Sequence, residues 1–213
     1  MRLIEVNDKK TREAFHLVPR RIYADDPVWI PQLKQDIDKL FDPEQNRIFK
    51  KGGTAKRWLV QEDNGQWVGR LAAFVHPKYS GGMKQPTGGM GFFESVDSDE
   101  VAALLIGAAE AWLQEQGMEA VDGPINFGEK DQFWGLLVKN FEDLPSYGLN
   151  YNPAYYRRFF DQHGYQVYYE QYIFSRRIDL DIQDLFARKR NQLEAKGEFE
   201  VVTARSLTQE QLA

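Results

Sequence analysis

The chain contains no cysteine among its 213 residues. This absence excludes disulfide bonds, thiolate nucleophiles and cysteine metal sites, and it fits a reducing compartment. Histidine is also scarce, since the sequence has only His16, His76 and His163. None of them has the spacing to another histidine or to a carboxylate that metal motifs show, so the sequence predicts no metal site.

Long hydrophobic runs and an excess of basic residues are missing as well. No segment approaches the roughly 20 apolar residues that span a bilayer, and the opening residues MRLIEVND hold no signal-peptide-like stretch. The formal net charge of −5 has the wrong sign for general nucleic-acid binding, which needs a basic surface. We therefore expect a cytoplasmic protein with neither a nucleic-acid nor a membrane partner.

Apolar residues are plentiful, at 42% of the chain, and aromatic residues make up 14%, which allows a sizeable core. Apolar spacing and turn residues predict the order of elements in the first 177 residues. Strands are expected over 3–6, 57–62, 66–76, 91–96, 119–122 and 165–177. Helices are expected after residues 7–8, near residue 31, and over 97–116, 133–141 and 153–162.

Several local signals support these elements. Asn64-Gly65 suits a tight hairpin turn, and Gly69 within the following strand indicates a bulge or a close backbone approach. Pro19 is expected to kink or end the first helix, and Pro31 to lie in the first turn of the second.

The helix over 97–116 carries the clearest boundary signals. Asp97 and Glu100 have the spacing of a capping box, and Gly117 is placed to end the helix. A glycine-rich loop over 80–89 is expected before the preceding strand. An antiparallel hairpin in the first half and alternating strands and helices in the second predict an α/β (α+β) fold. Its mixed, mostly antiparallel central sheet would carry helices on both faces.

The last 36 residues differ from the rest. A charged helix is expected over 181–196, then a strand over 199–203 and a helix start at 206. Residues 1–177 are predicted to form one domain. The order of elements after residue 178 resembles the opening of the chain. Residues 178–213 would begin a second, similar domain or form a C-terminal arm on the first. The aromatic content would suit packing with such a second domain or a homodimer.

The order of elements resembles the GNAT N-acetyltransferase fold. Residues 152–165, NPAYYRRFFDQHGY, look like the late helix of that family, with a Gly-aromatic pair before a strand. Residues 122–128, DGPINFG, followed by FWGLLV at 133–138 and YNPAYY at 151–156, are similar to uncharacterised bacterial GNAT-like proteins. Several of those proteins are longer and carry a second such domain.

The resemblance implies transfer of an acyl group from acetyl-CoA or another acyl-CoA to an amine of a small molecule or peptide. Glu94 matches the family's catalytic base. The family's acid position holds Phe160, which cannot transfer a proton. Tyr155 and Tyr156 lie one turn earlier, and Tyr156 is the candidate acid. Residues implied to contact the cofactor are Phe93, Ser95, Val96 and Asn152.

Each of these assignments has a structural alternative. Glu94 also fits an ordinary solvent-facing strand residue, and Tyr155 and Tyr156 suit aromatic packing beneath the sheet. Asn152 suits a helix cap.

The family's pyrophosphate loop is degenerate in this sequence. The junction VDSDEV at 96–101 has no glycine, arginine or lysine, and its three carboxylates stabilise a helix start but repel phosphate. A GNAT-like domain that binds a ligand or partner without catalysis is therefore the alternative to an N-acetyltransferase.

A polar cluster follows the strand over 119–122. Asn126, Glu129, Asp131 and Gln132 lie beside aromatic residues, at the kind of strand end where α/β sheets bind ligands. The pattern predicts a substrate pocket that includes Asn126, Glu129 and Trp134. The alternative is a structural Gly-Pro turn with helix-capping residues. Nothing in the sequence distinguishes one amine substrate from another.

Overall fold

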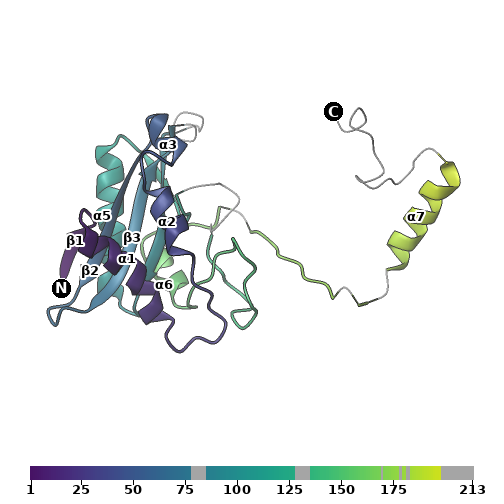
Figure 1. The fold of residues 1–213 in the computed structure, drawn as a ribbon, viewed down its shortest axis with the longest axis horizontal. Coiled ribbons are helices and arrows are strands. Elements are labelled where there is room, and N and C mark those ends of the chain that lie inside the picture. The colour runs from purple at the N-terminus through teal and green to yellow at the C-terminus, as the bar shows by residue number, and fades with distance from the viewer. Residues whose placement is uncertain (78–84, 128–134, 169, 178, 181–182, 198–213) are drawn as a thin grey trace. The chain divides into compact units, whose positions relative to one another are not determined.

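The computed structural model describes residues 1–77, 85–127, 135–168, 170–177, 179–180 and 183–197. The chain divides into two compact units, Met1–Gln166 and Val167–Ala213. The first unit holds the central sheet and its covering helices (Figure 1). In the second unit the described helix is α7, Asp184–Lys196, which ends at Gly197 with a positive φ angle of 65°.

A five-stranded sheet in the order β1-β2-β3-β4-β5 forms the centre of the first unit. Its strands are β1 (Arg2–Glu5), β2 (Thr54–Gln61), β3 (Trp67–Val75), β4 (Thr87–Ser95) and β5 (Ala120–Asp122). Neighbours from β1 to β4 pair antiparallel, and β5 pairs parallel with β4. The predicted mixed, mostly antiparallel sheet is confirmed.

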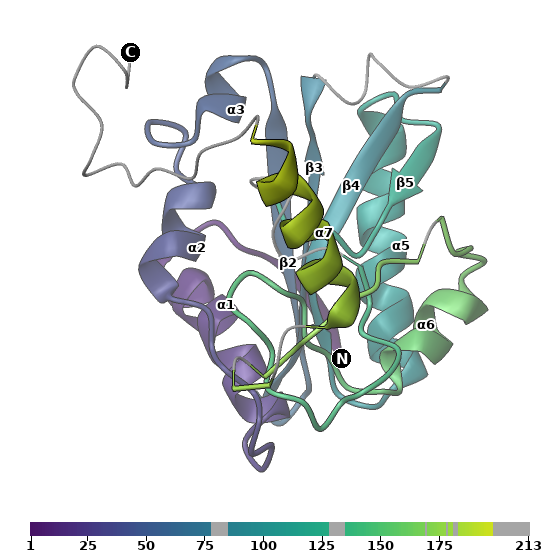
Figure 2. The same ribbon diagram turned by 90° about the vertical axis from the view of Figure 1, so that its right-hand side faces the viewer.

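Helices cover both faces of this sheet, as predicted (Figure 2). The helices of the first unit are α1 (Lys9–Ile22), α2 (Lys34–Leu40), α3 (Arg47–Lys50), α5 (Asp99–Glu115) and α6 (Tyr156–Gln162). On one face, α5 and α6 pack against inward-facing residues such as Leu71 and Phe93. On the other, α1 and α2 pack against a second cluster that includes Leu59 and Phe92. Alternation along the strands therefore supplies two separate cores.

The hairpin prediction is confirmed in detail. Gly65 has a φ angle of 87° in the turn, and the β2–β3 register shifts between Val60 and Gln61, opposite Gly69. A Cβ on Gly69 would lie 2.7 Å from a Val101 side-chain atom and 2.8 Å from one of Leu105. Gly69 thus has both a neighbouring bulge and a close approach of α5.

Pro19 does not end the first helix, and Pro31 does not lie in the first turn of the second. The helix α1 begins after Asp8, whose Oδ1 accepts from the Thr11 N–H at 2.7 Å, and it continues past Pro19 to Ile22. Pro19 removes one helical donor without ending the helix, because it lies close to the last turn. Pro31 lies outside α2, which begins three residues later at Lys34. Its first turn is closed by the Asp36 N–H, which donates to the Leu33 carbonyl.

Strand β4 starts earlier than predicted. Gly88 and Gly89 were assigned to a glycine-rich loop, but both belong to the strand, while residues 78–84 lie outside the described residues. A Cβ on Gly88 would lie 2.5 Å from Leu113, and one on Gly89 would lie 2.3 Å from the Phe74 ring. These glycines therefore let neighbouring side chains approach the strand.

Three further predictions are wrong. The cap of α5 is Ser98, whose side chain accepts from the Val101 N–H at 3.4 Å, and not Asp97, which is engaged in an ion pair described below. Residues 135–141 of the expected helix over 133–141 are not helical, and residues 133–134 lie outside the described residues. The expected strand over 165–177 is not formed by its described residues, where Phe174 is 90% exposed. Alternation alone does not make a strand when no neighbouring strand pairs with it.

The expected strand over 199–203 and the helix start at 206 also lie outside the described residues. Within the described residues, every helix is too short or too polar to cross a membrane.

Candidate functional site

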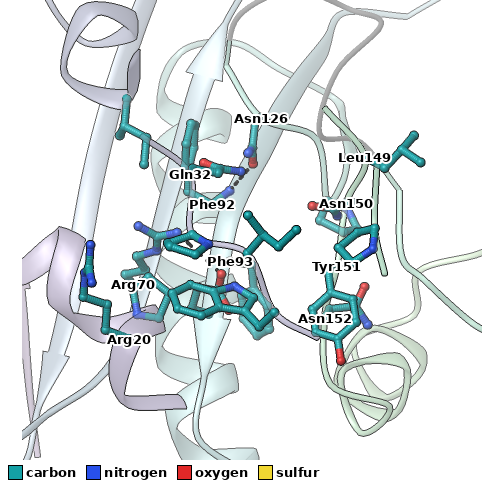
Figure 3. A pocket seen from close by; sticks show the side chains of 18 of the residues that line it. Arg20, Gln32, Arg70, Phe92, Phe93, Asn126, Leu149, Asn150, Tyr151 and Asn152 are labelled. Carbon is teal, nitrogen blue, oxygen red and sulfur yellow. Dashed lines mark hydrogen bonds and ion pairs between the residues drawn. The ribbon is translucent and has the colours of Figure 1, made fainter. Parts of the chain in front are cut away.

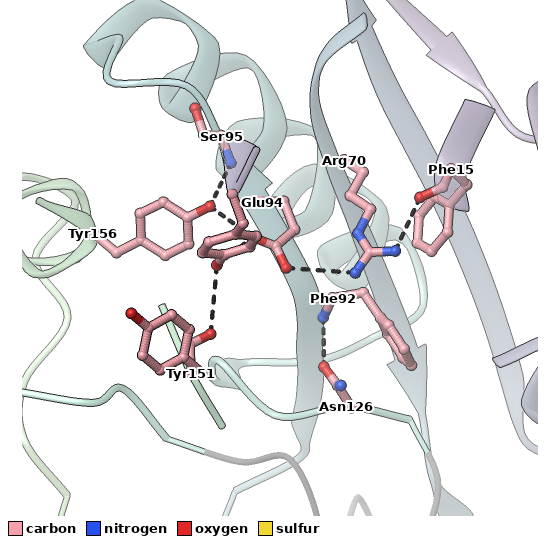
Figure 4. Close-up of polar contacts among 9 residues, drawn as sticks. Phe15, Arg70, Phe92, Glu94, Ser95, Asn126, Tyr151 and Tyr156 are labelled. Atoms are coloured by element: carbon pink, nitrogen blue, oxygen red, sulfur yellow. Dashed lines mark hydrogen bonds and ion pairs between the residues drawn. The ribbon is translucent and has the colours of Figure 1, made fainter. Parts of the chain in front are cut away.

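The centre of the candidate site is Glu94, the second-to-last residue of strand β4. Glu94 is only 9% exposed, so the interpretation as a solvent-facing strand residue is wrong. Its Oε2 accepts hydrogen bonds from the hydroxyl groups of Tyr23 and Tyr156, each at 2.8 Å (Figure 4). A buried carboxylate with two phenol donors joins the end of α1, strand β4 and helix α6.

Arg70 of strand β3 supplies the positive charge next to this carboxylate. One guanidinium nitrogen lies 3.5 Å from Glu94 Oε1, and another donates to the Phe15 carbonyl at 2.9 Å. That carbonyl would accept from residue 19 in an unbroken α-helix, but Pro19 has no N–H to donate. The proline in α1 therefore frees the acceptor that holds Arg70 beside Glu94.

Tyr156 lies at the start of α6 and is fully buried. Its hydroxyl oxygen accepts from the Ser95 N–H at 2.8 Å while the hydroxyl donates to Glu94. The Tyr155 hydroxyl donates to the Ser95 carbonyl at 2.8 Å. Phe160 packs in the core against Phe93, with ring centroids 5.2 Å apart. The structure thus brings together Glu94 and Tyr156, the two predicted catalytic residues.

A bulge in β4 precedes Glu94. The β3–β4 register shifts between Arg70 and Ala72, and Phe92 has a φ angle of 51°. The Phe92 N–H, turned out of the ladder, donates to Asn126 Oδ1 at 2.6 Å. Bulges redirect neighbouring side chains and are frequent beside active sites. Asn126 therefore holds the bulge from which Glu94 projects.

Burial sets the electrostatics of this cluster. Desolvation raises the pKa of Glu94, although Arg70 and the two phenol donors favour its charged form. Desolvation also raises the pKa of Tyr156 and of Tyr23 well above 10, and the nearby Glu94 charge adds to both shifts. The tyrosines therefore keep their protons at neutral pH, whereas Glu94 is moved toward the range in which a carboxylate acts as an effective base.

Glu94, Arg70 and Tyr156 line a pocket of about 280 Å³. Figure 3 shows Arg20 and Arg70 on one side, residues 149–152 on the other, and Phe92 and Phe93 between them. Aromatic and apolar side chains make up much of the wall, and further lining residues include Leu17, Trp29, Ile30, Leu136, Tyr147 and Leu149. Such a pocket suits an apolar ligand with one reactive polar group.

The aromatic wall is anchored to the same cluster. Trp29 stacks on Tyr23 with ring centroids 4.9 Å apart, and Tyr151 lies 5.9 Å from Tyr23. The Tyr151 hydroxyl donates to Asp26 Oδ2 at 2.7 Å, and Asp26 also accepts from the backbone N–H of Val28. The loop that carries Trp29 is therefore fixed against the segment that carries Tyr151.

The predicted substrate-pocket residues are only partly described. Asn126 lines the pocket, as the prediction required, while its amide oxygen is occupied by Phe92. Glu129 and Trp134 lie outside the described residues.

Asn152 also lines the pocket, but its amide is used within the protein. Its Oδ1 accepts from the Leu137 N–H at 2.8 Å, and its Nδ2 donates to the Leu137 carbonyl at 3.2 Å. The alternative that Asn152 caps a helix is wrong, because the cap of α6 is Tyr155. Asn152 instead joins the loop over 135–141 to the start of α6.

Replacing Asn152 with alanine should therefore loosen the pocket wall. The side chain is buried, and the Leu137 N–H would lose its partner, so we expect a loss of about 1–3 kcal/mol in the free energy of unfolding. Urea unfolding of Asn152→Ala measures this loss. Asn7→Ala, at an exposed position before α1, is the control, and equal effects of the two substitutions would contradict the assigned role.

The β4–α5 junction does not fit a pyrophosphate group. The N–H groups of Ser95 and Val96 are already bonded to Tyr156 and to the Val68 carbonyl. Arg158 pairs with Asp97 at 2.5 Å and with Asp99 at 3.0 Å, so the cation near this helix start is neutralised. With Glu100 the junction holds three carboxylates against this one cation, so it stays acidic and would repel phosphate oxygens. Binding of acyl-CoA at this junction stays a prediction, and the contacts described here do not favour it. The residues predicted to contact the cofactor are Phe93, Ser95, Val96 and Asn152.

Sequence reasoning missed three members of the site: Tyr23, Arg70 and Trp29. Arg70 had a visible signal, because it is a lone charge within the apolar strand WVGRLAAFV. Tyr23 and Trp29 had none, because their position depends on how the segment after α1 folds back over β4. Within the described residues, no group of three or more histidine, aspartate or glutamate side chains could hold a metal ion.

No protein-family model matches the chain. The chain is 30% identical over 162 residues to Protein YghO of Escherichia coli strain K12, covering 74% of this chain and 40% of that protein. It is 26% identical over 192 residues to the bacterial ceramide synthase of Caulobacter vibrioides, covering 88% of this chain and 48% of that protein. The chain thus spans less than half the length of both curated relatives.

One solved structure, "Putative acetyl transferase from Pyrococcus furiosus", aligns over 83% of this chain and 99% of that chain. The TM-score is 0.42 and the sequence identity 13%. Membership of the GNAT family stays a prediction.

Proposed function

We propose that the chain carries an N-acyltransferase site, which transfers an acyl group from a thioester to an amine. The observation that carries this proposal is the buried Glu94 carboxylate, bonded to two tyrosine hydroxyls at the base of an aromatic pocket. The similarity to a ceramide synthase supports it, because a ceramide is an amide between a fatty acid and a long-chain amino alcohol.

The chemistry needs a base and an acid at one place. The amine nitrogen attacks the thioester carbonyl, and a C–N bond forms while Glu94 removes an N–H proton. The C–S bond then breaks, and the thiolate takes a proton from Tyr156. Tyr156 recovers its proton from Glu94 along their 2.8 Å hydrogen bond. One proton lost by nitrogen is thus balanced by one proton gained by sulfur, and Glu94 and Tyr156 return to their starting states.

The pocket favours an amine with an apolar chain over a hydrophilic peptide. The mouth carries exposed apolar side chains, among them Leu17, Ile30 and Tyr147. An alkyl chain that covers such surface gains about 0.8 kcal/mol for each CH₂ group removed from water. The proposal does not specify which molecule carries the thioester. Coenzyme A would place its pyrophosphate against the acidic surface of the β4–α5 junction.

Product analysis tests the proposal. The purified chain is incubated with palmitoyl-CoA as thioester and with a long-chain amino alcohol or a lysine peptide as amine. Mass spectrometry should detect the long-chain amide and much less acylated peptide. Absence of any enzyme-dependent amide would overturn the proposal.

Tyr156→Phe should lower the rate of amide formation on the order of 10²-fold, because the thiolate loses its proton donor. The substitution keeps the ring packed against Phe93 and removes only the hydroxyl. Tyr155→Phe is the matched control, since its hydroxyl bonds to the Ser95 carbonyl and not to Glu94. Equal rates for Tyr156→Phe and the native chain would exclude Tyr156 as the acid.

The second candidate function is ligand binding without catalysis. The acidic β4–α5 junction favours it, because acyl-CoA-dependent transfer normally needs an anion site at such a helix start. Tight binding of the long-chain amine without amide formation would support this alternative.

A further inference from the structure

A second proton-carrying group, His16, lines the same pocket and has no part in the chemistry described above. His16 of α1 lies with its Nε2 2.8 Å from Asp38 Oδ1 of α2. The His16 side chain is 8% exposed and the Asp38 side chain 45% exposed. The pair therefore reaches from a buried pocket wall to solvent.

The contact with Asp38 sets the tautomer of the imidazole. A neutral His16 that donates from Nε2 to the carboxylate keeps the lone pair on Nδ1. Within the described residues Nδ1 has no hydrogen-bond partner, and His16 lines the pocket. The free lone pair is thus available to a ligand.

Arg70 links Glu94 to the backbone next to His16. Arg70 donates to the carbonyl of Phe15, the residue before His16, and its other end approaches Glu94 (Figure 4). The charged groups that act on His16 are Asp38 and Lys34 from α2, Glu13 from α1 and Arg70 from β3. Burial and the two cations lower the pKa of His16, and Asp38 opposes them. His16 is consequently uncharged at neutral pH and able to take a proton.

Amide formation from an ammonium ion releases one proton more than the thiolate takes up. An amine in water carries three N–H protons and a positive charge, and it must lose one proton before nitrogen can attack. Glu94 and Tyr156 account for the proton that passes from nitrogen to sulfur. The first proton requires another acceptor with a route to solvent.

We propose that His16 is this acceptor: its Nδ1 takes the first proton from the substrate ammonium, and the half-exposed Asp38 stabilises the imidazolium until solvent removes it. The inference rests on the proposed function. The substrate class it names is a primary ammonium ion, bound with its nitrogen between His16 and Glu94.

The test is an NMR titration of the three histidine side chains with and without a long-chain primary amine, with binding measured by calorimetry. His16→Gln assigns the His16 signals, and His163 is the internal control, because its Nδ1 contacts the Phe159 carbonyl at 2.7 Å outside the pocket. A bound ammonium disfavours a second cation, so saturating amine should lower the His16 midpoint by about one pH unit or more. The His163 signals at a fixed pH should not change when the amine binds.

Each result has a distinct meaning. Binding of the amine with an unchanged His16 midpoint would overturn this inference and leave the proposed function standing. No binding at all would overturn both. Asp38→Asn, which keeps a hydrogen-bond acceptor but loses the charge, should lower the His16 midpoint in the free protein. An unchanged midpoint in that variant would show that Asp38 does not stabilise the imidazolium.

Steady-state kinetics test whether His16 accepts the proton during the reaction. His16→Gln should reduce kcat/KM for the amine by about tenfold or more at pH 6 and by less at pH 9, where more of the amine arrives without its extra proton. His163→Gln should leave the profile unchanged. The same loss at both pH values in His16→Gln would indicate a structural role and contradict the inference.

Discussion

Glu94→Gln is expected to reduce amide formation on the order of 10²–10⁴-fold, the range found when a general base is removed. Glutamine has the same shape and still accepts the hydroxyls of Tyr23 and Tyr156, but it cannot take a proton from an amine. The measurement is the steady-state rate of long-chain amide formation. Glu62→Gln, in the exposed hairpin turn, is the matched control.

Folding must be measured alongside activity, because the substitution leaves Arg70 without its counter-charge. We expect a loss of about 1–3 kcal/mol in stability, and rates should be compared well below the melting temperature. The pKa of Glu94 is raised by burial, so native activity should fall as the pH drops through that value. A Glu94→Gln variant that is folded and retains native activity would exclude Glu94 as the base.

Gly91→Ala is expected to destabilise the first unit by about 3 kcal/mol or more. A Cβ on Gly91 would lie 1.9 Å from the Ile125 carbonyl oxygen and 2.8 Å from the Asn126 nitrogen. Both are backbone atoms, which cannot rotate away as a side chain can. The clash would separate the bulge of β4 from the loop that carries Asn126, and so disturb the setting of Glu94.

Gly107→Ala is the matched control, with an expected effect of opposite sign. Gly107 lies within α5, and a Cβ there would meet no atom within 4 Å. Alanine is favoured over glycine inside a helix by about 1 kcal/mol, so this variant should be more stable than the native chain. Urea unfolding of both variants measures the difference, and similar stabilities for the two would contradict the packing described for β4.

The sheet was predictable from the sequence because its signals are local. Asn64-Gly65 fixes the hairpin, and Gly117 marks the end of α5 by its positive φ angle of 79°. The predictions that failed concern residues whose structure depends on partners distant in the sequence. Gly88 and Gly89 resembled a loop because their reason for being glycine lies in Leu113 and Phe74. An expected strand over 165–177 failed because alternation does not supply a neighbouring strand.

The candidate site was predictable in its two central residues and in part of its pocket wall, where Asn126 and Asn152 lie. Glu94 and Tyr156 could be named from a family resemblance, but their 2.8 Å contact could not, since it joins residues 62 positions apart. Arg70 is visible in the sequence as a lone charge in an apolar strand, but its partners follow only from tertiary contacts, as does the role of His16. The carbonyl that holds Arg70 is free because of Pro19, and this consequence of a helix-interior proline is invisible without knowledge of the facing strand.

The most direct test of the account is a crystal structure of the chain with a long-chain primary amine. We predict that the amine nitrogen lies within about 3 Å of Glu94 Oε1 and of His16 Nδ1, with the alkyl chain directed past Trp29 to the mouth of the pocket. An amine bound elsewhere on the chain, or bound in this pocket with its nitrogen directed away from Glu94, would contradict the assignment of this pocket as the site of amide formation.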